Sequence, residues 1–159
     1  MKLPATFEPP MELAREEYIL EVLAPKHNQL DYEAWTSSRE ELVGIFGPRN
    51  GWPQDVSSLE HNRQDLEKHY QEFVQKEAFT YTILNPNRIE CIGCLYIRPT
   101  KAPGYDCRVD FWFRNSSRHL EEHFFIELKE WLTQAWKFAK VAYPGRELPW
   151  ERYYQLLDT

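Results

Sequence analysis

The stretch YDCRVDFWFR, residues 105–114, alternates two kinds of side chain along its whole length. One set of alternate positions is mainly apolar: Tyr105, Cys107, Val109, Phe111 and Phe113. The other set is mainly charged: Asp106, Arg108, Asp110, Trp112 and Arg114. A period of two is that of a β-strand, whose successive side chains point to opposite faces of the sheet. The stretch therefore predicts a strand, the clearest in the chain.

Two further strands precede it. Residues 79–84 (FTYTIL) are β-branched and aromatic, and residues 89–98 carry apolar Ile89, Cys91, Leu95 and Ile97, which we expect on one face. Short turns rich in Asn, Pro and Gly separate the three strands. Strands joined in this way form an antiparallel meander.

The longest helix is expected at residues 118–138, where apolar side chains recur at helical spacing. Ser116 or Ser117 would be its N-cap. A short strand follows at 139–143, and the intervening crossover helix would place it parallel to the strand at 105–114.

The N-terminal half predicts fewer elements. Residues 1–16 form an irregular lead-in, and the domain is expected at 17–159. Within it we expect a strand at 17–23, a short helix at 28–38 and a loop at 46–55. A second helix begins at Ser57, which with Glu60 has the form of a capping box. A last short helix covers 149–157, so the fold class is α/β with a mixed sheet.

Composition limits the class of protein. The 159 residues are 42% hydrophobic and carry a formal charge of −6, with a pI near 5.4. This balance predicts no nucleic-acid or anionic-membrane partner. No apolar run approaches the roughly 20 residues that cross a bilayer, and no secretory signal is recognisable. Three cysteines do not indicate a disulfide framework, which is typical of secreted proteins, so we expect the protein in the cytoplasm.

Three segments, in this order of elements, resemble a known superfamily. Cys91–Ile97 (CIGCLYI) and Val109–Arg114 (VDFWFR) resemble the third and fourth strands of the GNAT N-acetyltransferases, and Tyr154–Leu157 (YQLL) resembles their "Y-x-K-L" helix. The resemblance implies a GNAT-like acyl-CoA N-acyltransferase fold over about residues 17–157, lacking the last two strands of the family.

The resemblance also implies acetyl-CoA as co-substrate, with a peptide or small-molecule amine as acceptor. The pantetheine arm would pass between the fourth and fifth strands of the family, and the diphosphate would sit at the start of the long helix. Helix starts suit anions because their N–H groups are free and the helix dipole is positive there. Cofactor contacts are expected from Trp112, Phe113, Arg114 and Arg118.

For catalysis the resemblance implies a carboxylate base and a tyrosine that protonates the leaving sulfur. Asp110 is the candidate base and Tyr154 the candidate acid. Each has an alternative structural interpretation. Asp110 could pair with Arg108 or Arg114, and Tyr154 could be a core aromatic residue.

The expected diphosphate turn departs from the family pattern. Glu121 and His123 stand at two positions where the family has small residues, and Glu122 adds a second carboxylate. These carboxylates favour the helix start through its dipole but repel an anionic ligand. Two functions remain: divergent or weak acetyl transfer, or a catalytically inactive binding or assembly module. An exposed sheet edge would allow pairing in a homodimer.

Two short motifs suggest other chemistry. His119 to His123 match H-x-x-E-H, the motif of a zinc hydrolase, in which two histidines hold zinc and Glu122 would be the base. We favour a solvated helix start there and expect no metal. Cys91 and Cys94 form C-x-x-C, but residues three apart in a regular strand point to opposite faces. We therefore expect two packing cysteines.

Overall fold

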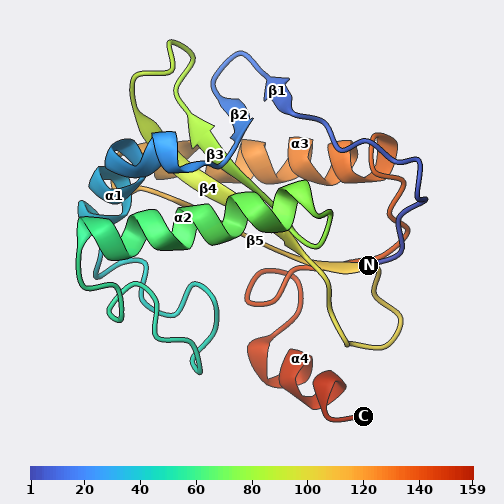
Figure 1. The fold of residues 1–159 in the computed structure, drawn as a ribbon. Helices are drawn as coiled ribbons and strands as arrows, with labels where there is room; N and C mark the ends of the chain where they lie inside the picture. Colours follow the sequence, from blue (N-terminus) through green and yellow to red (C-terminus); the bar gives the residue numbers. More distant parts are fainter.

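The computed structural model describes all residues from 1 to 159. The strands are β1 (Glu12–Ala14), β2 (Ile19–Val22), β3 (Phe79–Leu84), β4 (Cys91–Arg98), β5 (Cys107–Phe113) and β6 (Val141–Ala142). The α-helices are α1 (Asn28–Thr36), α2 (Leu59–Val74), α3 (Glu121–Gln134) and α4 (Trp150–Leu157), and η1 (Pro25–His27) and η2 (Asn115–Leu120) are short 3₁₀ helices (Figure 1).

The six strands form one sheet in sequence order. Strands β1 to β5 pair antiparallel with one another in turn, and β6 is parallel to β5. The predicted meander and the parallel last strand are therefore confirmed. Strand β1 was not expected, because it lies in the segment 1–16 that predicted no regular element. It forms a hairpin with β2 in which Leu13 pairs with Leu20.

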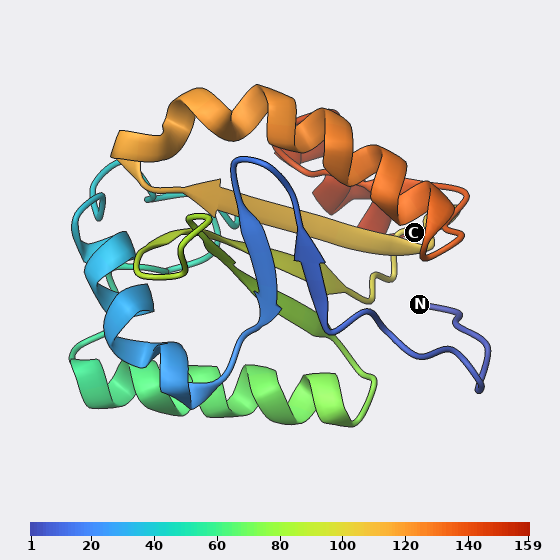
Figure 2. The ribbon, with the colours of Figure 1, turned by 90° about the horizontal axis from the view of Figure 1, so that it is seen from above.

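Helices cover both faces of the sheet. In Figure 2, α3 runs along one face, and α2 runs along the other with α1 beside it. Phe111 and Phe113 of β5 belong to the core under α3, while Trp112 belongs to a second core with Trp35 and Leu66. The predicted alternation in β5 is thus confirmed. The charged face is nevertheless covered as well, since Asp110 is only 3% exposed.

A β-bulge changes the faces of β4. Ile83 pairs with Gly93 and Leu84 with Cys91, so Ile92 is the extra residue on this strand. The bulge brings Cys91 and Cys94 into the same core under α1 and α2. The prediction that their side chains point to opposite faces is wrong for this reason, and so is the expectation that Cys91 shares a face with Leu95. All three cysteines are free and buried.

Helix α2 begins one residue later than its sequence signal indicated. Ser58, not Ser57, is the N-cap, and its Oγ accepts a hydrogen bond from the N–H of His61 at 3.0 Å. The helix is amphipathic, with Leu66 and Phe73 buried. None of the helices is long and apolar enough to cross a membrane.

Candidate functional site

Strands β5 and β6 separate after two residue pairs. Cys107 pairs with Val141 and Arg108 with Ala142. Beyond Ala142 the chain leaves the sheet through Pro144 and Gly145, and Gly145 has a φ of +82° that suits glycine. The outer edge of β5 from Val109 onward is therefore not paired with β6.

A cleft of about 240 Å³ lies where the two strands separate. We call it the edge cleft. It is lined by β5, η2, the first residue of α3, the segment after β6 and the loop after α1, and its lining includes Ile45, Asp110, Phe111, Arg118, Glu121 and Arg146. Its position between two diverging strands and a helix start is the one that the sequence resemblance assigns to acyl-CoA.

Arg146 occupies the inner part of this cleft. Its Nη2 donates a hydrogen bond to the carbonyl oxygen of Phe111 at 2.7 Å and lies 2.8 Å from Oε1 of Glu121. Its Cζ lies 3.6 Å from the centre of the Phe111 ring, a cation–π contact. Arg146 therefore ties the segment after β6 to both β5 and α3.

The start of α3 differs from the predicted turn. The chain forms the 3₁₀ helix η2 after β5, and α3 begins only at Glu121. The N-cap of α3 is Leu120, which offers no side-chain hydrogen bond, so the prediction of Ser116 or Ser117 is wrong. In a 3₁₀ helix the N–H groups bond to carbonyls three residues back, as the N–H of Ser117 does with Arg114. Fewer N–H groups are left for an anion.

Glu121 is the first residue of α3 and is bound on two sides. Its carboxylate lies 3.7 Å from Nε of Arg118 and 2.8 Å from Nη2 of Arg146. Two guanidinium groups thus converge on one carboxylate at the helix start. Their charge suits a diphosphate, but Glu121 holds the place that the diphosphate needs.

Asp110, the candidate base, is part of an ion-pair cluster. Its Oδ2 accepts from Nε of Arg108 at 2.7 Å and lies 3.7 Å from Nη2 of Arg98. Arg108 is the neighbour on the same strand, and Arg98 comes from β4. Of the two arginines that could pair with Asp110, Arg108 does so, whereas Arg114 pairs with Glu33 instead.

Tyr154, the candidate acid, does not line the edge cleft. Arg49 lies over its ring at 4.1 Å, and its hydroxyl packs tightly against Gly47. The preceding residue, Tyr153, faces the cluster instead: Arg108 lies 5.3 Å from its ring centre, and its hydroxyl is 2.7 Å from Oγ1 of Thr100. The sequence motif pointed to Tyr154, and its helical spacing alone did not distinguish the two tyrosines.

Three of the four predicted cofactor contacts are engaged in the interior. Trp112 donates to the Tyr96 hydroxyl at 3.0 Å, and the Phe113 ring packs 5.1 Å from that of Phe124. Arg118 alone of the four lines the edge cleft.

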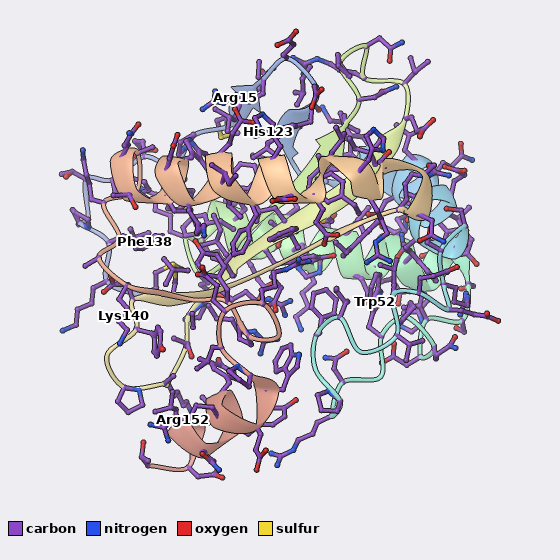
Figure 3. The ribbon with its side chains drawn as sticks, turned by 180° about the vertical axis from the view of Figure 1, so that it is seen from behind. Arg15, Trp52, His123, Phe138, Lys140 and Arg152 are labelled. Carbon is purple, nitrogen blue, oxygen red and sulfur yellow. The ribbon has the colours of Figure 1, made fainter.

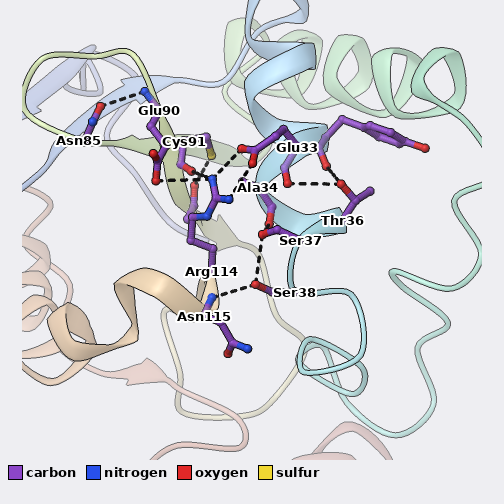
Figure 4. Close-up of polar contacts among 12 residues, drawn as sticks. Glu33, Ala34, Thr36, Ser37, Ser38, Asn85, Glu90, Cys91, Arg114 and Asn115 are labelled. Carbon is purple, nitrogen blue, oxygen red and sulfur yellow. Dashed lines mark hydrogen bonds and ion pairs between the residues drawn. The ribbon is translucent and has the colours of Figure 1, made fainter.

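Arg114 ties β5 to α1, as Figure 4 shows. It forms a bidentate pair with Glu33 at 2.6 and 2.7 Å and donates to the Cys91 carbonyl at 3.2 Å. This pairing lowers the pKa of Glu33. The neighbouring Asn115 N–H donates to Oγ of Ser38, so the end of β5 is held by side chains rather than left open.

The H-x-x-E-H motif is divided between two helices. His119 belongs to η2 and His123 to α3, so the two do not share one continuous α-helix. Nε2 of His123 lies 3.3 Å from Oε1 of Glu127, and Glu127 also pairs with Arg15. Figure 3 shows Arg15 and His123 beside each other. No group of three or more His, Cys, Asp or Glu side chains is placed to hold a metal ion.

From this arrangement we expect purified protein to carry no stoichiometric zinc, because the third ligand is missing. A chelator should leave the thermal melting curve unchanged. Elemental analysis and melting with and without the chelator test this. One zinc per chain that is lost in the variant His119→Ala would contradict it.

Comparison with known proteins adds the fold family. No protein-family model matches the sequence, and no curated protein matches it. Among solved structures, the ribosomal-protein-S5-alanine acetyltransferase of Vibrio fischeri superposes with a TM-score of 0.67 at 15% identity, over 94% of this chain and 81% of that one. RimL, a ribosomal L7/L12 α-N-protein acetyltransferase in complex with coenzyme A, superposes with a TM-score of 0.59 at 16% identity. The match covers 79% of this chain and 67% of that one.

A Bordetella pertussis protein of the GNAT acetyltransferase group gives a TM-score of 0.62 at 13% identity, covering 93% of this chain and 87% of that one. Identities this low establish architecture and leave the reaction open. The element order, the separation of β5 and β6 and these superpositions lead to one conclusion. The chain has the GNAT acetyltransferase fold.

Proposed function

We propose that this protein is a divergent GNAT-type N-acetyltransferase that transfers acetyl weakly from acetyl-CoA to a peptide or small-molecule amine. The observation that carries the proposal is the edge cleft. Two arginines, Arg118 and Arg146, converge there on the start of α3 beside the unpaired edge of β5. The solved structures with this fold are acetyltransferases, which supports the same reaction class.

The cleft fits coenzyme A in charge but not in its present arrangement. Acetyl-CoA would supply the thioester when bound, and Arg118 and Arg146 are the residues that would hold its diphosphate. In the structure the carboxylate of Glu121, not a diphosphate, pairs with these arginines, and Arg146 also donates a hydrogen bond to the Phe111 carbonyl. Because the resident ion pair has to open, we propose weak cofactor binding.

Asp110 remains the proposed general base. It is the buried carboxylate that lines the edge cleft, and Arg108 and Arg98 hold its orientation. Tyr153 contacts the same cluster through Arg108, which makes it a positioning residue there. We place the protein in the cytoplasm, since three free buried thiols suit a reducing compartment.

A binding or assembly module is the second candidate. The observation that favours it is the Arg146–Glu121 pair, since Arg146 also holds the Phe111 carbonyl on β5. A module would keep the fold for its surface and need no cofactor.

Acetyl-CoA titration with a transfer assay distinguishes the two. We expect almost no shift in Tm at tens of micromolar, because a ligand stabilises the folded state by about 2.7 kcal/mol only near 100 times its Kd. At millimolar acetyl-CoA we expect a saturable shift and slow release of free thiol in the presence of a peptide amine. Asp110→Asn should lower this turnover about 100-fold. Absence of both binding and turnover at millimolar concentration would leave the module as the function.

A further inference from the structure

A second cleft opens on the face of the sheet that α2 covers. It lies between α2 and the loop that connects α1 to α2, next to β4, and its volume is about 360 Å³. We call it the α2 cleft. The residues that matter below are Asp31, Phe46, Trp52, Asp65, Tyr96 and Arg98. None of its lining residues lines the edge cleft, and Trp52, labelled in Figure 3, comes from the connecting loop.

Asp31 is the unusual residue of this cleft. It is 4% exposed, yet it lines the cleft and forms no ion pair with any lysine, arginine or histidine. One of its oxygens accepts a hydrogen bond from Nδ2 of Asn62 at 3.0 Å, and the other accepts none. A buried carboxylate without a cationic partner costs several kcal/mol.

The surrounding side chains hold Asp31 in place without neutralising it. Asn62 is fixed by Asn28 at 2.8 Å and by Nε1 of Trp35 at 3.1 Å. Burial raises the pKa of Asp31 to about 6, and the nearby carboxylate of Asp65 adds to this. The carboxyl is therefore rigid, desolvated on one side and open to the cleft on the other.

None of the basic side chains that line the α2 cleft pairs with Asp31. Arg98 lies 4.9 Å from the ring centres of both Phe46 and Tyr96 and pairs with Asp110. Lys68 is exposed at the rim and forms no ion pair. Burial lowers the pKa of His69 to about 4, so its imidazole is neutral. Asp31 thus lacks an internal counter-ion. Burial raises the pKa of Asp65, and the charges of His61 and Lys68 act against this. Aromatic rings form the adjoining walls.

We propose that the α2 cleft binds an organic ammonium ion, whose charge pairs with Asp31 and whose apolar part packs against Trp52. An ammonium supplies the missing hydrogen-bond donor to the free oxygen of Asp31, and an aromatic wall attracts a cation at the same time. A metal ion fits less well, since no set of three ligating side chains converges in the molecule. This inference does not rest on acetyl transfer, because Asp31 and Trp52 do not line the edge cleft, although Arg98 of the α2 cleft pairs with Asp110 of the edge cleft.

Benzylammonium is a suitable probe, and its neutral counterpart benzyl alcohol is the control. Titration of the full chain without acetyl-CoA, followed by NMR shifts of the Trp52 indole, should show saturable binding of benzylammonium. Asp31→Asn keeps the size of the side chain and its bond to Asn62 but removes the charge. We expect its affinity to fall at least tenfold. Asp158→Asn, at the exposed end of the chain, should bind like the unmodified protein.

The pH dependence provides a second measurement on the unmodified protein. Asp31 must be ionised to pair with the probe, so affinity should rise with pH through about 6. At about pH 5 only a tenth of the carboxyl is ionised, and binding should be about tenfold weaker than at pH 7.5. Asp65 of α2 and Cys91, Cys94 and Tyr96 of β4 lie close to Asp31. The other titratable or charged residues that line the cleft are Asp55, His61, Lys68, His69 and Arg98.

Three results would overturn the proposal. Benzyl alcohol could bind as tightly as benzylammonium, Asp31→Asn could retain full affinity, or the folded protein could fail to bind the probe at millimolar concentration. Each would mean that Asp31 does not recognise a cation. None of them bears on acetyl transfer, which is measured separately.

Discussion

Glu121→Gln should raise the affinity of the protein for acetyl-CoA about tenfold. The substitution keeps the shape of the side chain but removes the charge that occupies the expected diphosphate position and holds Arg146. Unit charges about 4 Å apart near a protein surface interact by roughly 1 to 4 kcal/mol, and 1.4 kcal/mol is tenfold in Kd. Calorimetric titration of coenzyme A into both proteins measures the change.

Glu122→Gln is the matched control for this experiment. Glu122 lies in the same first turn of α3, is exposed and forms no ion pair. Its removal changes the helix-dipole interaction by a similar few tenths of a kcal/mol but leaves Arg146 in place. An equal gain in both variants would contradict a specific role for Glu121.

A second variant tests the role of Arg146 itself. If Arg146 binds the diphosphate after leaving Glu121, the double variant Glu121→Gln, Arg146→Ala should lose the gain. The gain should also shrink with rising salt, since exposed charges are screened. A double variant that binds more tightly than Glu121→Gln would show that Arg146 only obstructs the cleft.

Gly93→Ala should destabilise the fold by about 3 kcal/mol or more. A Cβ at this position would overlap the carbonyl oxygen of Trp112 on the neighbouring strand β5, and backbone atoms cannot move aside as a flexible side chain can. Gly93 pairs with Phe113 and follows the bulge at Ile92. Overpacking a well-packed core usually costs 1 to 3 kcal/mol, and here the obstacle is the sheet itself. Urea denaturation measures the free energy of unfolding.

Gly104→Ala is the control for the loss of glycine alone. Gly104 has a φ of +84°, but no atom lies within 4 Å of a Cβ placed there. We expect a cost of only about 1 to 2 kcal/mol from the left-handed backbone. If Gly93→Ala were no less stable than Gly104→Ala, the close approach of β4 and β5 at this point would be disproved.

The sheet could be predicted because its signal is local. Alternation along residues 105–114 reports the two faces of β5, and the turns around the meander set strand order. The bulge at Ile92 could not be read in the same way. Gly93 is the one local hint, because an isolated glycine in a strand can mark a bulge, but which residue is extra is visible only in the pairing of β4 with β3. The faces of Cys91 and Cys94 depended on it.

The candidate site likewise has features that the local sequence predicts and features that depend on tertiary packing. The sequence by itself determined the strand and crossover helix that make this fold, and it placed Glu121 at a helix start, because strand period and helix position are properties of neighbouring residues. Only the tertiary structure decided that Arg146 reaches the Phe111 carbonyl 35 positions earlier, that Arg114 turns to Glu33 and that Tyr153 rather than Tyr154 faces Arg108. These partners come from separate elements, and only their packing brings them within bonding distance.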